Sequence, residues 1–161
     1  MLATLLFLLQ ITSSNTLHVV GDSQCAGVSF VVKNVTEMRR WSTIKSTCQV
    51  GSTTSQWVVK IDSVGIRPGD DVLVFLGSND WWGKPNARLL LAKLKGTRCV
   101  FVGPPLIRGK AGAADTLKTQ VEDDRTCRYL DSRQLHLVQP DGVHTSESIR
   151  WLRAGVAKLL E

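Results

Sequence analysis

Several features that define common protein classes are scarce or missing in this chain of 161 residues. It has no Cys-x-x-Cys pair and only three histidines, so the spacing of a zinc site is absent and no metal or other cofactor is expected. Its apolar runs are too short to cross a bilayer, so no membrane span is expected. The basic residues are scattered and are not interleaved with aromatic residues, which argues against nucleic acid as a partner.

Acidic residues are also fewer than basic ones, and the formal net charge is +6. Such an excess most often gives a solvated surface, and a patch that faces an anion is the alternative. The oligomeric state is not indicated by any of these features. What the chain does have is 43% hydrophobic residues, at a length that suits one domain with a sizeable core.

The first 16 residues resemble a secretory signal. Met1–Leu9 is apolar and the polar run Gln10–Thr16 follows, although no lysine or arginine precedes the apolar part. The alternative is an N-terminal strand or helix packed on the core. We therefore expect a signal peptide or an N-terminal extension over residues 1–16 and one domain over residues 17–161. With a signal the protein would be secreted or periplasmic, and without one it would be cytoplasmic.

The four cysteines are Cys25, Cys48, Cys99 and Cys127. An even number fits the disulfides of an exported protein, but it also fits free thiols, since cysteine is among the most buried residue types. Three of the four fall in runs with strand character, and we therefore expect core thiols rather than disulfides. The pairing that disulfides would adopt is left open.

Apolar runs with strand character alternate with stretches of helical character. Val72–Leu76 and Val100–Val102 are continuous apolar runs, as expected for strands covered on both faces. The expected strands are Leu17–Val20, Ser46–Val50, Asp71–Leu76, Cys99–Val102 and Cys127–Leu130, and the expected helices are Cys25–Trp41, Ser55–Val64, Asn86–Lys95, Ala111–Asp123 and Ser146–Leu160. This alternation predicts an α/β fold, a three-layer α/β/α sandwich around a parallel sheet of about five strands.

Ser23 is the strongest candidate for a reactive group. The strand-like pair Val19-Val20 leads into Gly21-Asp22-Ser23, which places a hydroxyl at the carboxyl edge of the sheet, where open α/β folds bind their ligands. The alternative is that Ser23 only caps a helix, a common role of serine. Cys25 is a weaker candidate nucleophile, because a reactive thiol needs a partnered base.

A serine nucleophile needs a base, and the chain offers few. His18 lies within a strand, and His136 has no carboxylate near it in the sequence. His144 follows Asp141 by three residues in a loop, a spacing that lets the carboxylate accept the imidazole Nδ1–H and orient the ring. We therefore predict Ser23 as nucleophile, His144 as general base and Asp141 as the residue that orients His144.

An oxyanion hole needs hydrogen-bond donors aimed at the developing charge. Gly51 can bring its N–H close to a ligand, although a left-handed turn alone would also explain a glycine there. Asn79 can donate from its side-chain amide, and Ser23 from its N–H. The neighbouring Asp22 and Asp80 are expected to stabilise their own turns.

Taken in order, these segments resemble the conserved blocks of the SGNH (GDSL-type) hydrolase superfamily over roughly residues 17–160. The blocks are Gly21-Asp22-Ser23, Gly51, Gly77-x-Asn79-Asp80 and Asp141-x-x-His144. The resemblance implies a flavodoxin-like fold, a Ser23–His144–Asp141 triad, and an oxyanion hole of Ser23, Gly51 and Asn79. The first block of the family often ends in leucine; Gln24 stands there instead, and we expect it to line the substrate pocket.

Four tryptophans complete the set of candidate residues. Trp81 and Trp82 follow the Asn79-Asp80 pair directly, and we predict that they contact substrate, as an apolar wall or a platform for a sugar ring. The alternative is that one of them packs on the core. Trp41 and Trp57 fall on expected helices and are predicted to be buried.

The predicted function is that of a serine ester hydrolase. It removes an acyl group, preferably acetyl, from an acylated small molecule or a carbohydrate through an acyl-enzyme. Left open are a thioesterase or lysophospholipase that acts on longer acyl chains, an acyltransferase, and a binding module that keeps the fold without turnover.

Overall fold

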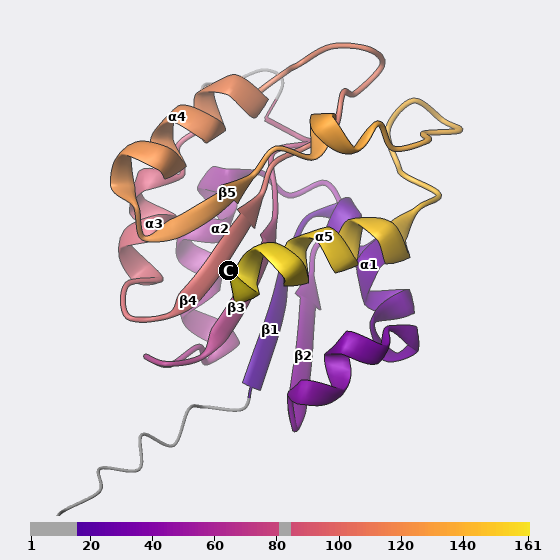
Figure 1. Cartoon of the computed structure of the whole chain (residues 1–161). Helices are drawn as coiled ribbons and strands as arrows, with labels where there is room; N and C mark the ends of the chain where they lie inside the picture. Colours follow the sequence, from indigo (N-terminus) through magenta and orange to yellow (C-terminus); the bar gives the residue numbers. More distant parts are fainter. Residues whose placement is uncertain (1–15, 81–84) are drawn as a thin grey trace, which may run out of the picture.

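The computed structural model describes residues 16–80 and 85–161. Its centre is a parallel sheet of five strands in the order β2-β1-β3-β4-β5 (Figure 1). The strands are β1 (Thr16–Gly21), β2 (Thr43–Cys48), β3 (Asp71–Phe75), β4 (Arg98–Val102) and β5 (Cys127–Leu130), and the α-helices are α1 (Ser23–Val31), α2 (Thr54–Lys60), α3 (Arg88–Lys93), α4 (Ala114–Asp124) and α5 (Ser148–Leu160). The predicted α/β class and the flavodoxin-like, three-layer arrangement are confirmed.

Side chains of the sheet alternate between two hydrophobic cores, one on each face. Leu73 and Phe75 of β3 pack with α1 and α5, where the Phe75 ring meets Trp151 edge-on with centroids 5.2 Å apart. Val72 and Val74 belong to the opposite cluster, which α2, α3 and α4 cover. Figure 1 shows the two helix layers on either side of the sheet. Because both faces are covered, β3 and β4 are apolar after their first residues, Asp71 and Arg98.

The helix predicted over Cys25–Trp41 is wrong in its second half. α1 ends at Val31, and two short 3₁₀ helices follow, η1 (Val32–Asn34) and η2 (Thr36–Arg40). Val35 between them is extended, with φ −97° and ψ 117°, and its side chain is buried. β-branched residues and asparagine are poor helix formers, so burial of the valines overrides the helical spacing here. Trp41 and Trp57 are buried, as predicted.

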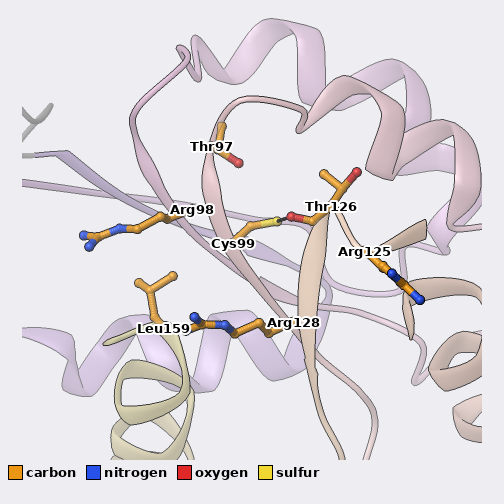
Figure 2. Close-up of a pocket in the computed structure, with 7 residues that line it drawn as sticks. All are labelled: Thr97, Arg98, Cys99, Arg125, Thr126, Arg128 and Leu159. Carbon is orange, nitrogen blue, oxygen red and sulfur yellow. Dashed lines mark hydrogen bonds between the residues drawn. The ribbon is translucent and has the colours of Figure 1, made fainter. Parts of the chain in front are cut away.

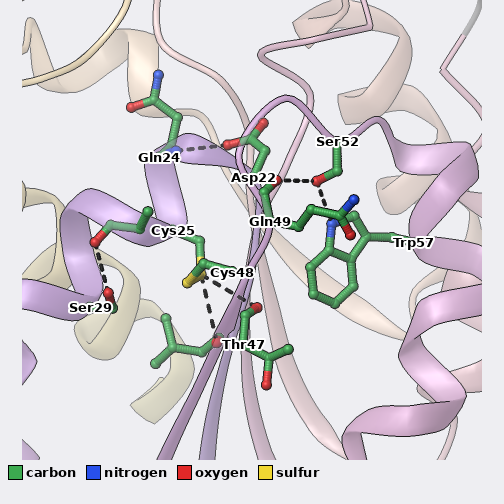
Figure 3. The surroundings of a disulfide bond; sticks show 11 residues. Asp22, Gln24, Cys25, Ser29, Thr47, Cys48, Gln49, Ser52 and Trp57 are labelled. Atoms are coloured by element: carbon green, nitrogen blue, oxygen red, sulfur yellow. Dashed lines mark hydrogen bonds between the residues drawn. A yellow bond between two sulfur atoms is a disulfide. The ribbon is translucent and has the colours of Figure 1, made fainter.

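The expectation of free thiols is wrong, because the four cysteines form two disulfides. Cys99 and Cys127 are register partners on β4 and β5, with Cα atoms 4.7 Å apart. Cys48 at the end of β2 is joined to Cys25 in the first turn of α1, with Cα atoms 5.5 Å apart (Figure 3). Both bridges link elements that become neighbours only in the assembled sheet, which a general tendency of cysteine to be buried cannot reveal.

The direction in which strands are added to the sheet reverses at β1. The chain passes from β1 through α1 to β2 on one side, and then through α2 to β3 on the other side. Sheets of this order bind ligands beyond the carboxyl ends of the strands at such a switch point. Gly21 is required there, because a Cβ would lie 1.9 Å from the Phe75 carbonyl oxygen. The close approach lets the Asp22 N–H donate to that oxygen at 3.0 Å.

Two predictions concern residues outside the described parts of the chain. One is the signal peptide or extension over residues 1–16, of which the structure describes only Thr16, the start of β1. The other is the pair Trp81 and Trp82. Within residues 16–80 and 85–161, no helix has the length and apolar character needed to cross a membrane.

Candidate active site

Ser23 is the first residue of α1 and follows β1 directly at the switch point. Its side chain is partly exposed, and its hydroxyl has no hydrogen-bond partner among the described residues. The helix cap is Asp22, whose Oδ1 accepts the Gln24 N–H at 2.8 Å. Ser23 is therefore not needed as a cap, and its hydroxyl is free at a helix N-terminus, where negative charge is favoured.

Asp22 also connects the two loops at the switch point. Its Oδ2 accepts the Ser78 N–H at 3.2 Å, which ties the end of β1 to the loop after β3. The side chain is fully buried and makes no salt bridge within the described residues. Burial raises the pKa of Asp22 to about 7, although the two N–H donors oppose this shift. Asp22 thus stabilises its turn, as predicted, and also fixes the loop that carries Asn79.

Asp141 and His144 form a hydrogen-bonded carboxylate–imidazole pair. His144 Nδ1 lies 2.7 Å from Asp141 Oδ2, and Asp141 Oδ1 accepts the N–H groups of Val143 at 2.8 Å and His144 at 2.6 Å. These bonds hold the pKa of Asp141 well below its usual range. An ionised carboxylate favours the proton on Nδ1, so Nε2 is left to accept one. Both side chains are about half exposed, His144 at 50% and Asp141 at 55%.

Gln24 does not lie in a substrate pocket, contrary to the prediction from the sequence. Its side chain is buried, with 3% exposed, and Nε2 donates to the Val143 carbonyl oxygen at 2.7 Å. It therefore does not line a substrate pocket, and that prediction is corrected. The bond joins the residue after Ser23 to the residue before His144, so the candidate nucleophile and base are held at the same end of the sheet. A leucine at this position could not donate such a bond.

Three candidate donors for an oxyanion lie on neighbouring loops. Asn79 is partly exposed, and Nδ2 donates to the Ser52 carbonyl oxygen at 3.1 Å, which leaves its second hydrogen for a ligand. Gly51 is left-handed, with φ 76°, and open space lies where a side chain would be. The N–H groups of Gly51 and Ser23 have no acceptor within the part of the chain that the structure describes. Such donors are suited to a developing negative charge.

Asp80 has a partner that the sequence did not indicate. Its carboxylate accepts the Thr54 hydroxyl at 2.6 Å and the Thr54 N–H at 3.2 Å, across 26 positions of sequence. Asp80 therefore has a structural role beyond the one predicted for it at its own turn. The bond fastens the loop after β3 to the start of α2, and these two segments adjoin only because β3 returns beside β1. It also limits the movement of the neighbouring Asn79.

The other two histidines have no place in this site. His18 is buried in β1, and its Nε2 lies 3.1 Å from Asp70 Oδ2 at the amino end of the sheet. Burial lowers the pKa of His18, so the ring is neutral near pH 7. His136 is exposed at the end of η4 (Ser132–Leu135), in a left-handed conformation with φ 47°. His144 alone among the three is hydrogen-bonded to a carboxylate at the carboxyl end.

Among the described residues, two cavities lie at opposite ends of the sheet. A cavity of about 80 Å³ lies between the loops that follow β4 and β5, close to the segment that carries Asp141 and His144; it is lined by Pro105, Leu106, Ser132, Arg133, His136, Leu137 and Gln139. A cavity of about 200 Å³ surrounds Cys99 at the starts of β4 and β5, far from these residues in the fold (Figure 2). Within the described ranges, no group of three or more His, Cys, Asp or Glu side chains is placed to hold a metal ion.

Comparison with known proteins gives matches in structure only. No family model and no curated protein matches the chain. An acetylxylan esterase from Geobacillus stearothermophilus superposes with a TM-score of 0.63 at 15% identity, over 91% of this chain and 94% of the other. A GDSL-like lipase from Bacteroides thetaiotaomicron gives 0.60 at 15% identity, over 91% and 86%. A member of the lipolytic G-D-S-L family from Veillonella parvula gives 0.59 at 15% identity, over 90% and 96%.

The chain has the fold of the SGNH (GDSL-type) hydrolases. At 15% identity the likeness describes the fold and not the chemistry. The interpretation of the site within this SGNH fold therefore rests on the residues of this chain. The order of the motifs in the sequence identified Ser23, Asn79, Asp141 and His144 as candidates. The hydrogen bonds of Asp22 and Gln24 show how the loops that carry these residues are held.

Proposed function

We propose that this protein is a serine ester hydrolase. The observation that carries the proposal is the hydrogen-bonded Asp141–His144 pair on a loop that Gln24 fastens beside Ser23. A serine at a helix N-terminus, a histidine oriented by an ionised carboxylate, and free amide donors on the adjoining loops are the parts that acyl transfer needs.

In the proposed reaction, Ser23 Oγ attacks the acyl carbonyl carbon while His144 Nε2 takes the hydroxyl proton. The carbonyl oxygen becomes an oxyanion, which accepts hydrogen bonds from the N–H groups of Ser23 and Gly51 and from the Asn79 amide. The bond to the alcohol then breaks, and His144 gives its proton to the leaving oxygen. Water, activated by His144, attacks the acyl-Ser23 intermediate and releases the carboxylic acid.

The proposed substrate is a short acyl ester, such as an acetyl group on a carbohydrate. One structure with this fold is an acetylxylan esterase, which supports a short acyl group. That Trp81 and Trp82 contact the substrate, as an apolar wall or a platform for a sugar ring, remains a prediction. A longer acyl chain is the second candidate, because other structures of the fold are lipases. The relative kcat/KM for acetyl and decanoyl esters of one alcohol distinguishes the two.

The test is hydrolysis of 4-nitrophenyl acetate by the wild type and by Ser23→Ala. The variant should lose at least about 10³-fold in kcat, since no other group replaces the nucleophile. Ser29→Ala is the matched control, because Ser29 lies on the same helix and its hydroxyl only donates to Ala26 O at 2.7 Å. A fluorophosphonate should label the wild type and the control at Ser23. A wild type that is neither active nor labelled is instead a binding module.

We also propose that the protein works outside the reducing cytosol, in a secreted or periplasmic setting. Its two disulfides support this, since disulfides persist in oxidising compartments. N-terminal sequencing of the exported protein should then return a start near Asn15. Recovery of protein that still begins at Met1 would contradict the signal peptide.

A further inference from the structure

The loop between β4 and α4 contains a tight turn at an unusual residue. Ile107 and Lys110 pair across the turn, with N–H···O distances of 3.1 and 2.9 Å. The two central residues, Arg108 and Gly109, are both left-handed, with φ 48° and 72°. Turns of this type strongly prefer glycine, asparagine or aspartate at both positions, because other side chains are strained there. An arginine at the first position therefore needs another reason, and strained residues cluster at functional sites.

This turn lies directly on the loop that carries Asp141 and His144. The Arg108 N–H donates to the Gly142 carbonyl oxygen at 2.7 Å. A Cβ on Gly142 would lie 3.3 Å from the Arg108 Cγ, so the stem of the arginine side chain runs along this glycine. Gly142 stands between Asp141 and Val143, and the arginine is thus fixed beside the candidate base by a backbone bond and by side-chain contact.

The guanidinium group of Arg108 has no partner within residues 16–80 and 85–161. Arg108 is exposed, and it forms no ion pair or side-chain hydrogen bond with any residue that the structure describes. The nearest carboxylate in sequence on this loop, Asp141, is already occupied by the His144 ring and by two N–H groups. Lys110, at the end of the same turn, is also exposed and adds a second positive charge.

We propose that Arg108 binds an oxyanion, a carboxylate or a phosphate, on the alcohol portion of the substrate. The inference rests on the proposed ester hydrolysis and adds the chemical class of the alcohol. In that reaction His144 protonates the leaving oxygen, so the alcohol lies against the His144 loop, on the side where Arg108 is held. Guanidinium groups bind carboxylate and phosphate oxygens through two parallel hydrogen bonds, and the contacts with Gly142 fix the backbone and the side-chain stem from which the Arg108 guanidinium extends.

The experiment compares three acetyl esters whose alcohols differ in charge. They are 4-acetoxybenzoate, 4-acetoxyphenyl phosphate and the neutral methyl 4-acetoxybenzoate. The variant is Arg108→Asn, because asparagine tolerates the left-handed conformation and the turn is expected to fold at least as well. The matched control is Arg125→Asn, which removes the same charge from another left-handed arginine, with φ 62°, at the end of α4.

The measured quantity is the ratio of kcat/KM for each anionic ester to kcat/KM for the neutral one. Arg108→Asn should lower this ratio about tenfold, mainly through KM, because one charge-assisted contact is lost. Arg108→Lys should restore part of the ratio, Arg125→Asn should leave it at the wild-type value, and added salt should lower it in the wild type. Whichever anionic ester shows the effect identifies carboxylate or phosphate.

Two results overturn the inference in distinguishable ways. A ratio that Arg108→Asn does not change, including an equal loss on all three esters, shows that Arg108 does not recognise the anion while the ester hydrolysis stands. No hydrolysis of any of the three esters by the wild type removes the proposed function, and the inference with it.

Discussion

The amino and carboxyl ends of the sheet each bury two carboxyl groups, but they satisfy them differently. At the amino end, Asp71 accepts from the Arg98 guanidinium at 2.7 and 2.6 Å and from Trp41 Nε1 at 2.6 Å, while Asp70 lies 3.1 Å from the His18 ring. At the carboxyl end, Asp22 and Asp80 accept only from N–H groups and a hydroxyl among the described residues.

The difference distinguishes an end whose buried carboxyl groups have charged or histidine partners from the end that carries the proposed reactive groups. Pairing with a cation or a histidine satisfies a buried charge and lowers the cost of ionising it. At the carboxyl end, within the residues that the structure describes, the exposed Arg108 forms no ion pair and the N–H groups of Ser23 and Gly51 have no acceptor. Donors left without an acceptor beside a candidate nucleophile are what a ligand site requires.

Asp141→Asn should have the largest effect and should be confined to the carboxyl end. An amide cannot hold His144 in the required tautomer, so kcat should fall about 10³- to 10⁴-fold with little change in stability. The measurement is the rate on 4-nitrophenyl acetate together with thermal unfolding. Asp115→Asn is the control, because Asp115 is an exposed carboxylate on α4. A loss of less than tenfold would mean that the exposed Asp141 does not orient the base.

Asp22→Asn should change how the free energy of unfolding depends on pH, because the buried Asp22 carboxylate has no cationic partner among the described residues. The folded pKa of Asp22, about 7, lies above the ordinary value of 3.8, so the folded state holds the proton more tightly and wild-type stability falls as pH rises from about 4 to 7. The variant cannot ionise. Its deficit in unfolding free energy should therefore be largest near pH 4 and shrink by up to about 4 kcal/mol by pH 8.

Urea unfolding of the wild type and Asp22→Asn at several pH values measures this deficit. A deficit that grows with pH would show that the two N–H donors outweigh burial and that the carboxylate is the stabilising form.

Asn79→Ala should slow catalysis without unfolding the loop. Removing one oxyanion donor costs about 2.7–4 kcal/mol of transition-state stabilisation, or about 10²- to 10³-fold in kcat. Asp80 still fastens the loop to Thr54, so the unfolding midpoint should change little. An unchanged kcat would leave the amide as a structural group that only supports Ser52.

Asp71→Asn should give the smallest effect on activity and a clear effect on stability. The substitution removes the buried charge that Arg98 contacts, and we expect the free energy of unfolding to fall by about 2 kcal/mol. This loss is smaller than for a fully buried pair because the Arg98 side chain is 61% exposed. Asp62→Asn, which removes an exposed pair with Lys93, should cost less than about 1 kcal/mol. A large loss of kcat in Asp71→Asn would show that the amino end also contributes to activity, contrary to the proposed division.

Prediction from the sequence was most accurate for elements that a continuous apolar run marks in the sequence. The apolar runs around Val72–Leu76 and Val100–Val102 identified the central strands, because strands buried on both faces must be apolar throughout. It was least accurate at Val32–Arg40, where local propensity is weak and the burial of Val35 decides the backbone. The candidate nucleophile and base followed from motif order and from the three-residue spacing of Asp141 and His144.

The parts of the site that the sequence did not reveal depend on contacts across the fold. Gln24 bonds to Val143 at a separation of 119 positions, and Asp80 bonds to Thr54 at 26. The Cys99–Cys127 bridge required knowing that β4 and β5 are adjacent. Nothing in the sequence distinguished Arg108 from other surface arginines. Its left-handed backbone and its contact with Gly142, seen only in the structure, place it beside the Asp141–His144 loop.

The sequence alone determined the α/β class, the strands at the centre of the sheet and the identity of the candidate reactive groups, because hydrophobic periodicity and short motifs are local properties of the chain. Tertiary structure decided the strand order, both disulfides, the buried position of Gln24 and the placement of Arg108 beside the Asp141–His144 loop. Each of these is a pairing between distant segments, and its energy exists only once the two helix layers have closed on the sheet.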